Sequence, residues 1–243
     1  MNHNSKTSKL VFVLLVSGSV MMAYNITKTV VKPSIYPPLN HHPQLIDTAT
    51  IEICNQVWIT HNLNVATYRN GDSIPQVRDP KAWLDLRTGA WCWYNNDSAT
   101  YATTYGKLYN WYAVHDSRGL APQGWHVPSH KEWCDFDTCI GSDSLGFRMR
   151  GRGWPVPAST ADNSSGFNGL PGGMRSDGGT FRLLGLGAVF WVSDEGSTSE
   201  TWCYRMVQYM NDEKKHLMGT GWGYMSKTEG YSVRCVRDTM SNR

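Results

Sequence analysis

Residues 88–114 of the chain read TGAWCWYNNDSATYATTYGKLYNWYAV, a run in which aromatic side chains recur between turn-forming residues. A second aromatic stretch, residues 124–133, reads GWHVPSHKEW, and a third, residues 230–238, reads GYSVRCVRD. Sequence of this composition builds its core from large aromatic side chains that pack against irregular loops. We therefore expect a domain with few long helices, several short strands and long loops.

The clearest local signal predicts a helix over residues 129–140. Ser129 and Glu132 have the Ser-x-x-Glu spacing of a capping box, in which each side chain binds a free backbone N–H at the helix start. Pro128 keeps the incoming chain extended, and Gly141 ends the helix. The predicted buried stripe consists of Trp133, Phe136 and Ile140.

A second helix is predicted over residues 105–114, where Leu108, Trp111 and Tyr112 recur at helical spacing. Alternating glycines between aromatic residues are interpreted as a tight turn at residues 219–223. The remaining regular elements are predicted to be short strands over residues 51–59, 190–192, 202–209 and 231–237.

Five ordered motifs, the three above with residues 55–68 (NQVWITHNLNVATY) and 165–175 (SGFNGLPGGMR), resemble the Fibrobacter succinogenes major paralogous domain. That family is bacterial and extracytoplasmic, and it is similar to C-type-lectin-like and formylglycine-generating-enzyme-like domains. The resemblance implies an α+β, C-type-lectin-like fold over residues 51–238, with two helices, a small twisted antiparallel sheet and long loops. It also implies that the first strand pairs with the last.

The N-terminal 23 residues have the layout of a secretory signal, with two lysines before the apolar run LVFVLLVSGSVMMA. Fourteen helical residues are about 21 Å long, which is short of the ~30 Å hydrocarbon core of a membrane. We expect cleavage after Ala23. An uncleaved anchor is the alternative, because Met21 is large for such a site. No cysteine precedes Cys54, so a lipoprotein is not expected.

The rest of the chain divides into a proline-rich linker over residues 24–50, a domain over residues 51–238 and a tail over residues 239–243. The formal net charge of +3 is too small to indicate a nucleic-acid partner. The expected location is the periplasm or the cell surface, in association with the outer membrane.

Six cysteines in an exported chain favour disulfides over metal or redox chemistry. Cys92 and Cys235 lie inside motifs that carry the resemblance, so we expect them to face each other or pair. Cys134 and Cys203 stand where the family pattern usually has other residues, which suggests a second bridge between the helix at 129–140 and a late strand.

Cys134 and Cys139 cannot pair if both are helical, because their Cα atoms would be about 8.7 Å apart, beyond the ~7 Å limit. Cys54 and Cys139 are then free or joined to each other. Formylglycine-generating enzymes use two cysteines five residues apart just before the last strand, whereas the late part of this chain offers Cys203 and Cys235. An oxidase of that type is therefore the least favoured functional hypothesis.

Other catalytic patterns are missing from the sequence, including the Gly-x-Ser-x-Gly elbow, His-Glu-x-x-His and the phosphate-binding loop. His126 lies in GWHVPS, and we expect it to satisfy a buried backbone group rather than to act as a base. Asp135 and Asp137 are two residues apart on one helix and so face different ways. We expect no catalytic residue and no enzyme activity.

No cofactor is expected, although a structural calcium ion is an open alternative. Lectins that hold sugars through calcium carry Glu-Pro-Asn or Gln-Pro-Asp followed by Trp-Asn-Asp, and neither pattern occurs here. Asp194, Glu195, Asn211 and Asp212 could still gather oxygen atoms around an ion. A solvated acidic loop is the other interpretation.

The expected function is recognition or assembly at the cell envelope through contacts with an envelope or outer-membrane protein, including as a soluble subunit of an outer-membrane complex. Glycan recognition by exposed aromatic residues is the alternative. Aromatic side chains with a polar tip are typical of recognition surfaces, although Trp202 and Trp222 could instead be core residues. The candidate contact residues are Asp194, Trp202, Tyr204, Tyr209, Asn211, Asp212, Trp222 and Tyr224.

Overall fold

The computed structural model describes residues 49–141, 145–154, 163–210 and 216–239. All of them belong to one compact unit, residues 43–243. The predicted export segment, most of the linker and residues 240–243 lie outside the described ranges. Within those ranges, no helix is both long and apolar enough to cross a membrane.

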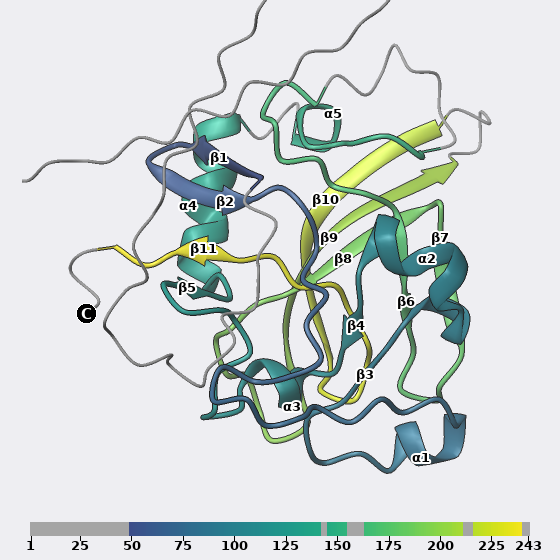
Figure 1. Ribbon diagram of the computed structural model, residues 1–243. Coiled ribbons are helices and arrows are strands. Elements are labelled where there is room, and N and C mark those ends of the chain that lie inside the picture. The colour runs from purple at the N-terminus through teal and green to yellow at the C-terminus, as the bar shows by residue number, and fades with distance from the viewer. Residues whose placement is uncertain (1–48, 142–144, 155–162, 211–215, 240–243) are drawn as a thin grey trace, which may run out of the picture. The chain divides into compact units, whose positions relative to one another are not determined.

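The described residues form an α+β domain with two main sheets (Figure 1). One sheet has the order β1 (Thr50–Ile53), β2 (Gln56–Ile59), β11 (Val236–Arg237) and β5 (Trp125–His126). The other has the order β10 (His216–Ser226), β9 (Glu200–Met210), β8 (Gly187–Trp191), β6 (Gly172–Arg175) and β7 (Phe181–Leu184). A two-stranded ladder joins β3 (Trp91–Cys92) and β4 (Leu108–Tyr109).

Neighbouring strands are antiparallel apart from β6 and β8, which are parallel. The α-helices in the described ranges are short: α1 (Pro80–Leu84), α2 (Ser98–Tyr105), α3 (Trp111–Val114), α4 (His130–Ile140) and α5 (Leu145–Arg148). A 3-10 turn spans Tyr94–Asn96. The coarse α+β prediction is thus confirmed, while the helices are more numerous and shorter than the two predicted.

Helix α4 forms as its sequence predicts. The Ser129 hydroxyl accepts a hydrogen bond from the Glu132 N–H, and the Glu132 carboxylate accepts one from the Ser129 N–H at 2.8 Å, which completes the capping box. The predicted stripe is buried and consists of Trp133, Phe136 and Ile140.

The helix predicted over residues 105–114 is wrong in its first half. Gly106, with φ +69°, ends α2, and the chain then forms strand β4 before α3 begins. Asn110 fixes the start of α3, because its side-chain oxygen accepts hydrogen bonds from the N–H groups of Ala113 and Ala90. One of these partners is twenty residues away, so helical periodicity alone could not reveal the break.

The predicted strand over residues 51–59 is a hairpin. Cys54 and Asn55 have φ values of 56° and 65°, which reverses the chain between β1 and β2. The strand that pairs with β11 is consequently β2, through Val236 and Trp58, rather than β1. The predicted turn at residues 219–223 is also wrong, since these residues lie inside strand β10 and pair with β9.

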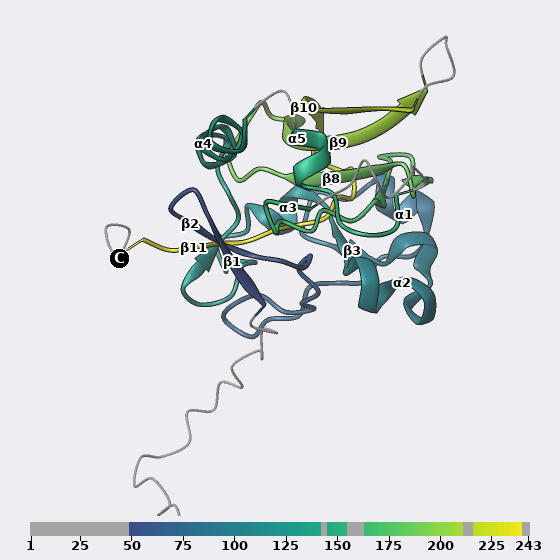
Figure 2. The same ribbon diagram turned by 90° about the horizontal axis from the view of Figure 1, so that it is seen from above.

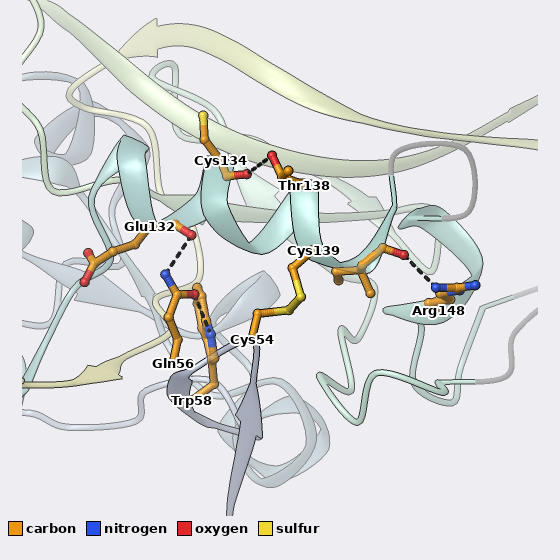
Figure 3. The surroundings of a disulfide bond; sticks show 9 residues. Cys54, Gln56, Trp58, Glu132, Cys134, Thr138, Cys139 and Arg148 are labelled. Atoms are coloured by element: carbon orange, nitrogen blue, oxygen red, sulfur yellow. Dashed lines mark hydrogen bonds between the residues drawn. A yellow bond between two sulfur atoms is a disulfide. The ribbon is translucent and has the colours of Figure 1, made fainter.

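The disulfide in the structure joins Cys54 to Cys139 and so fastens the β1–β2 hairpin to the end of α4 (Figure 3). This is one of the two outcomes predicted for that pair. The two bridges predicted elsewhere are wrong, because Cys92, Cys134, Cys203 and Cys235 are free.

Packing explains why the predicted bridges do not form. Cys92 packs in a small cluster with Trp83 and Leu108, whereas Cys235 lies in a different hydrophobic cluster. Cys203 is fully buried, but Cys134 is partly exposed on α4, where its sulfur lies 3.6 Å from Nδ1 of His130. Figure 3 shows Cys134 pointing away from the Cys54–Cys139 bridge.

Candidate functional site

Four of the predicted contact residues form two cross-strand pairs in the β9–β10 hairpin. Trp202 lies opposite Tyr224, and Tyr204 lies opposite Trp222. Side chains two residues apart on a strand point to the same face, so these four rings share one face of the hairpin. Helices α4 and α5 both lie beside this hairpin (Figure 2).

Helix α4 covers one end of this aromatic row. Trp133 of α4 stacks on Tyr204 with ring centroids 4.4 Å apart and an interplanar angle of 9°. The Tyr204 hydroxyl donates to the Asp137 carboxylate at 2.7 Å, and burial raises the pKa of both groups. Tyr204 is therefore a core residue and not a contact residue.

The other end of the row is open. The exposed fraction is 36% for Trp202 and 40% for Tyr224, and their ring centroids are 5.0 Å apart. His130, the first residue of α4, lies between the covered and open ends, with its ring 4.0 Å from that of Trp222 and 5.6 Å from that of Trp202. We call His130, Trp202, Trp222 and Tyr224 the open ring cluster.

The loop between β8 and β9 borders the cluster. The exposed carboxylate of Asp194 accepts a hydrogen bond from the N–H of His130, and the Thr201 hydroxyl donates to the Asp194 carbonyl at 2.8 Å. A Cβ placed on Gly196 would lie 2.8 Å from the Tyr224 hydroxyl, so this loop passes directly beside that ring. The structure thus places Asp194 next to the open ring cluster.

The acidic residues considered for calcium have separate partners. Glu195 binds Lys227 at 3.1 Å and His115 at 3.7 Å, while the Asp194 carboxylate accepts a hydrogen bond from the His130 N–H. Across the described ranges, no group of three or more His, Cys, Asp or Glu side chains could hold a metal ion. The other predicted residues, Asn211 and Asp212, lie outside the described ranges, as does the side chain of Tyr209.

His126 has a different role from the one predicted. Its ring nitrogens contact two carboxylates rather than a backbone group, with Nε2 2.7 Å from Glu132 and Nδ1 2.8 Å from Asp238. Hydrogen bonding to Glu132, and then to Asp238, raises the pKa of the imidazole despite its partial burial. The histidine therefore ties β5, α4 and the segment after β11 together.

The sequence did not single out His130. Its position directly after the Ser129 cap placed it at the helix start, but its contact with β9 and β10 depends on tertiary packing. Side chains in a helix lean toward its N-terminus, which brings this imidazole over the hairpin rings that α4 leaves uncovered. The resulting surface combines exposed aromatic faces with hydrogen-bonding groups, which suits non-covalent recognition.

The sequence model of the Fibrobacter succinogenes major domain matches residues 51–237, well over half of the chain. Comparison with curated proteins and with solved structures found no match. The matched range lies within the compact unit and contains the open ring cluster and both main sheets, apart from the first residue of β1. The protein belongs to the Fibrobacter succinogenes major domain family.

Proposed function

We propose that the protein is an exported, non-enzymatic recognition module that acts at the bacterial cell envelope, with the open ring cluster as its contact surface. The observation that carries this proposal is the exposed pair Trp202 and Tyr224, held on two hydrogen-bonded strands. Rings fixed in this way lose little conformational entropy on binding. The signal-like N-terminus supports the location.

The state of the free cysteines supports a non-enzymatic role. Cys203 and Cys235, the late cysteines that an oxidase of the formylglycine-generating type would need, are buried. Burial raises the pKa of each thiol to about 12, so neither forms the thiolate that such chemistry requires near neutral pH.

We also propose that the fold is C-type-lectin-like. The pairing of β2 with β11 brings the start and the end of the domain together. Long irregular segments connect short strands, and a helix packs beside the late strands. An experimental structure of the domain tests this assignment: it predicts the lectin-like connectivity, and a different order of the strands would contradict it.

Binding to the envelope tests the proposed function. The full chain, expressed with its export segment so that the disulfide can form, is purified and mixed with the envelope fraction of the source bacterium. We expect the chain to sediment with the envelope, and the double variant Trp202→Ala/Tyr224→Ala to remain in solution. Leu186→Ala, which removes a 44% exposed apolar side chain elsewhere, is the matched control and should sediment like the wild type. Equal sedimentation of all three proteins, or of none, would contradict the proposal.

A further inference from the structure

We infer that the open ring cluster binds a neutral pyranose glycan and does so without calcium. This inference rests on the proposed recognition function and names the ligand class of the same surface. Both hypotheses need the rings of Trp202 and Tyr224 to be accessible, as they are.

The extent of the exposed aromatic surface favours a sugar over a protein. A stable protein interface buries roughly 800 Å² on each partner, over about 20–30 residues. In the described ranges, the exposed large apolar side chains outside the cluster are Leu84, Phe147 and Leu186, which lie on or next to α1, α5 and β7. The cluster thus offers two exposed rings to a ligand, which corresponds to one or two sugar rings.

The ring geometry suits a pyranose. The planes of Trp202 and Tyr224 are inclined by 65°, so the two rings form a corner rather than a flat surface. The face of an aromatic ring is electronegative, and the C–H groups on the face of a pyranose carry partial positive charge. A sugar ring that stacks on one aromatic face in this corner has its hydroxyl edge close to the second ring and to the residues around it.

Hydrogen-bond acceptors surround the corner. Glu200 and Ser226 form the next cross-strand pair on the same face as Trp202 and Tyr224, and Glu200 is exposed. The exposed Asp194 carboxylate also lies next to the cluster, since it accepts a hydrogen bond from the His130 N–H. Carboxylate and hydroxyl oxygens accept hydrogen bonds from sugar hydroxyls.

The charge of the residues around the corner favours a neutral ligand. Glu200 and Asp194 are both acidic, so an acidic glycan would be repelled. Several basic side chains in this region have partners within the protein: Lys227 pairs with Glu195, Lys131 pairs with Asp135, and Arg205 donates to the Trp222 carbonyl at 3.2 Å. In this proposal the ligand contacts come from the aromatic rings and from hydrogen bonds to carboxylate and hydroxyl oxygens, without a calcium ion.

Titration with defined sugars tests the inference. Cellohexaose, xylohexaose, maltohexaose and mannohexaose are titrated into the full chain by calorimetry, with hexagalacturonate as the acidic control. Each titration is run in EDTA and again with calcium. We expect at least one neutral sugar to bind with the same affinity under both conditions, and hexagalacturonate not to bind. Trp202→Ala should weaken binding at least tenfold, Tyr224→Ala should also weaken it, and Leu186→Ala should leave it unchanged.

Three results would overturn the inference: no neutral sugar binds, binding requires calcium, or both ring variants bind as well as the wild type. Circular dichroism of each variant confirms that it is folded, and the two ring variants are independent, so failure of one to fold leaves the other as the test. If no sugar binds while sedimentation with the envelope still depends on Trp202, the proposed recognition function stands and the inferred sugar ligand is wrong. If sedimentation also fails, both proposals fail.

Discussion

The imidazole of His130 lies 4.0 Å from the indole of Trp222, centroid to centroid. This contact marks the point at which helix α4 stops covering the aromatic face of the β9–β10 hairpin. On one side of it Tyr204 is fully buried under Trp133, and on the other side Trp202 is 36% exposed. The same row of rings therefore contributes to the core at one end and to the surface at the other.

Because Tyr204 is buried and Trp202 is partly exposed, similar substitutions at the two positions should change the stability of the fold by different amounts. Tyr204→Phe should destabilise the fold by about 1–2 kcal/mol, because the half-buried Asp137 carboxylate loses its hydrogen-bond donor. Tyr204→Ala should cost about 3–5 kcal/mol through the cavity it leaves. Trp202→Ala should cost less than Tyr204→Ala, since the Trp202 ring is partly in water. Urea denaturation measures all three; a larger loss for Trp202→Ala than for Tyr204→Ala would contradict the assignment.

The Cys54–Cys139 bridge should stabilise the fold more than any of the four free cysteines does. It links residues 85 apart in sequence, and removing such a bridge from an exported domain typically costs about 2–5 kcal/mol. We expect Cys54→Ser/Cys139→Ser to lose stability in that range. Cys134→Ser, on the same helix, should change it by less than about 0.5 kcal/mol.

Peptide mapping without reduction checks the pairing itself. It should recover one peptide pair joined through Cys54 and Cys139, and alkylation after unfolding should label the other four cysteines. A bridge between Cys92 and Cys235, or between Cys134 and Cys203, would contradict the structure.

Arg234 should be intolerant of replacement even by lysine. Its guanidinium is fully buried, and burial lowers its pKa to about 9. The guanidinium donates hydrogen bonds to several backbone carbonyls at once. Lysine cannot reproduce this fork of donors, so Arg234→Lys should cost about 3–5 kcal/mol. Arg237→Lys, on the exposed side of the same segment, is the control and should behave like the wild type in thermal unfolding. The acceptors of Arg234 are the Asn62 side chain and the carbonyls of Ile59, Phe167 and Asn168.

Stability should fall at alkaline pH through His126. Its pKa in the folded chain is raised above the ordinary 6.5 by Glu132 and then by Asp238. The protonated ring therefore stabilises the fold fully below 6.5, and this contribution disappears as the pH rises through the folded-state pKa. Because the imidazole is 31% exposed, we expect a loss of at most about 1 kcal/mol.

Comparison with His126→Gln isolates this effect. The difference in unfolding free energy between wild type and variant should shrink as the pH rises from 6.5 through the raised pKa of His126 in the folded chain. Below the ordinary carboxylate range the difference should shrink again, because hydrogen bonds from His126 and Ser129 outweigh burial and lower the pKa of Glu132. A difference that stays constant with pH would show that the two carboxylates do not act on the imidazole.

Local signals in the sequence were sufficient where a few adjacent residues determine the structure. The capping box of α4 needs only Ser129 and Glu132, and it forms as predicted. The break before α3 was missed because it depends on Asn110, whose side chain binds groups about twenty residues upstream. The spacing of residues along the chain cannot predict such a contact.

The same limit applies to the disulfide and to the site. Cys54 meets Cys139 because the β1–β2 hairpin packs on α4, which no cysteine spacing reveals. Four of the aromatic residues grouped from the sequence, Trp202, Tyr204, Trp222 and Tyr224, form cross-strand pairs in the hairpin. Which of them are exposed depends on where α4 ends. That is why Tyr204 was misassigned and His130 was missed.

Oxidative footprinting tests most directly whether the open ring cluster is the contact surface. The full chain is exposed to hydroxyl radicals alone and with the envelope fraction of the source bacterium, and labelling is mapped by mass spectrometry. We predict that Trp202 and Tyr224 become protected in the presence of the envelope, while Leu84 and Leu186, which are also exposed, are labelled equally in both samples. Unchanged labelling of Trp202 and Tyr224, with protection elsewhere on the domain, would contradict the account.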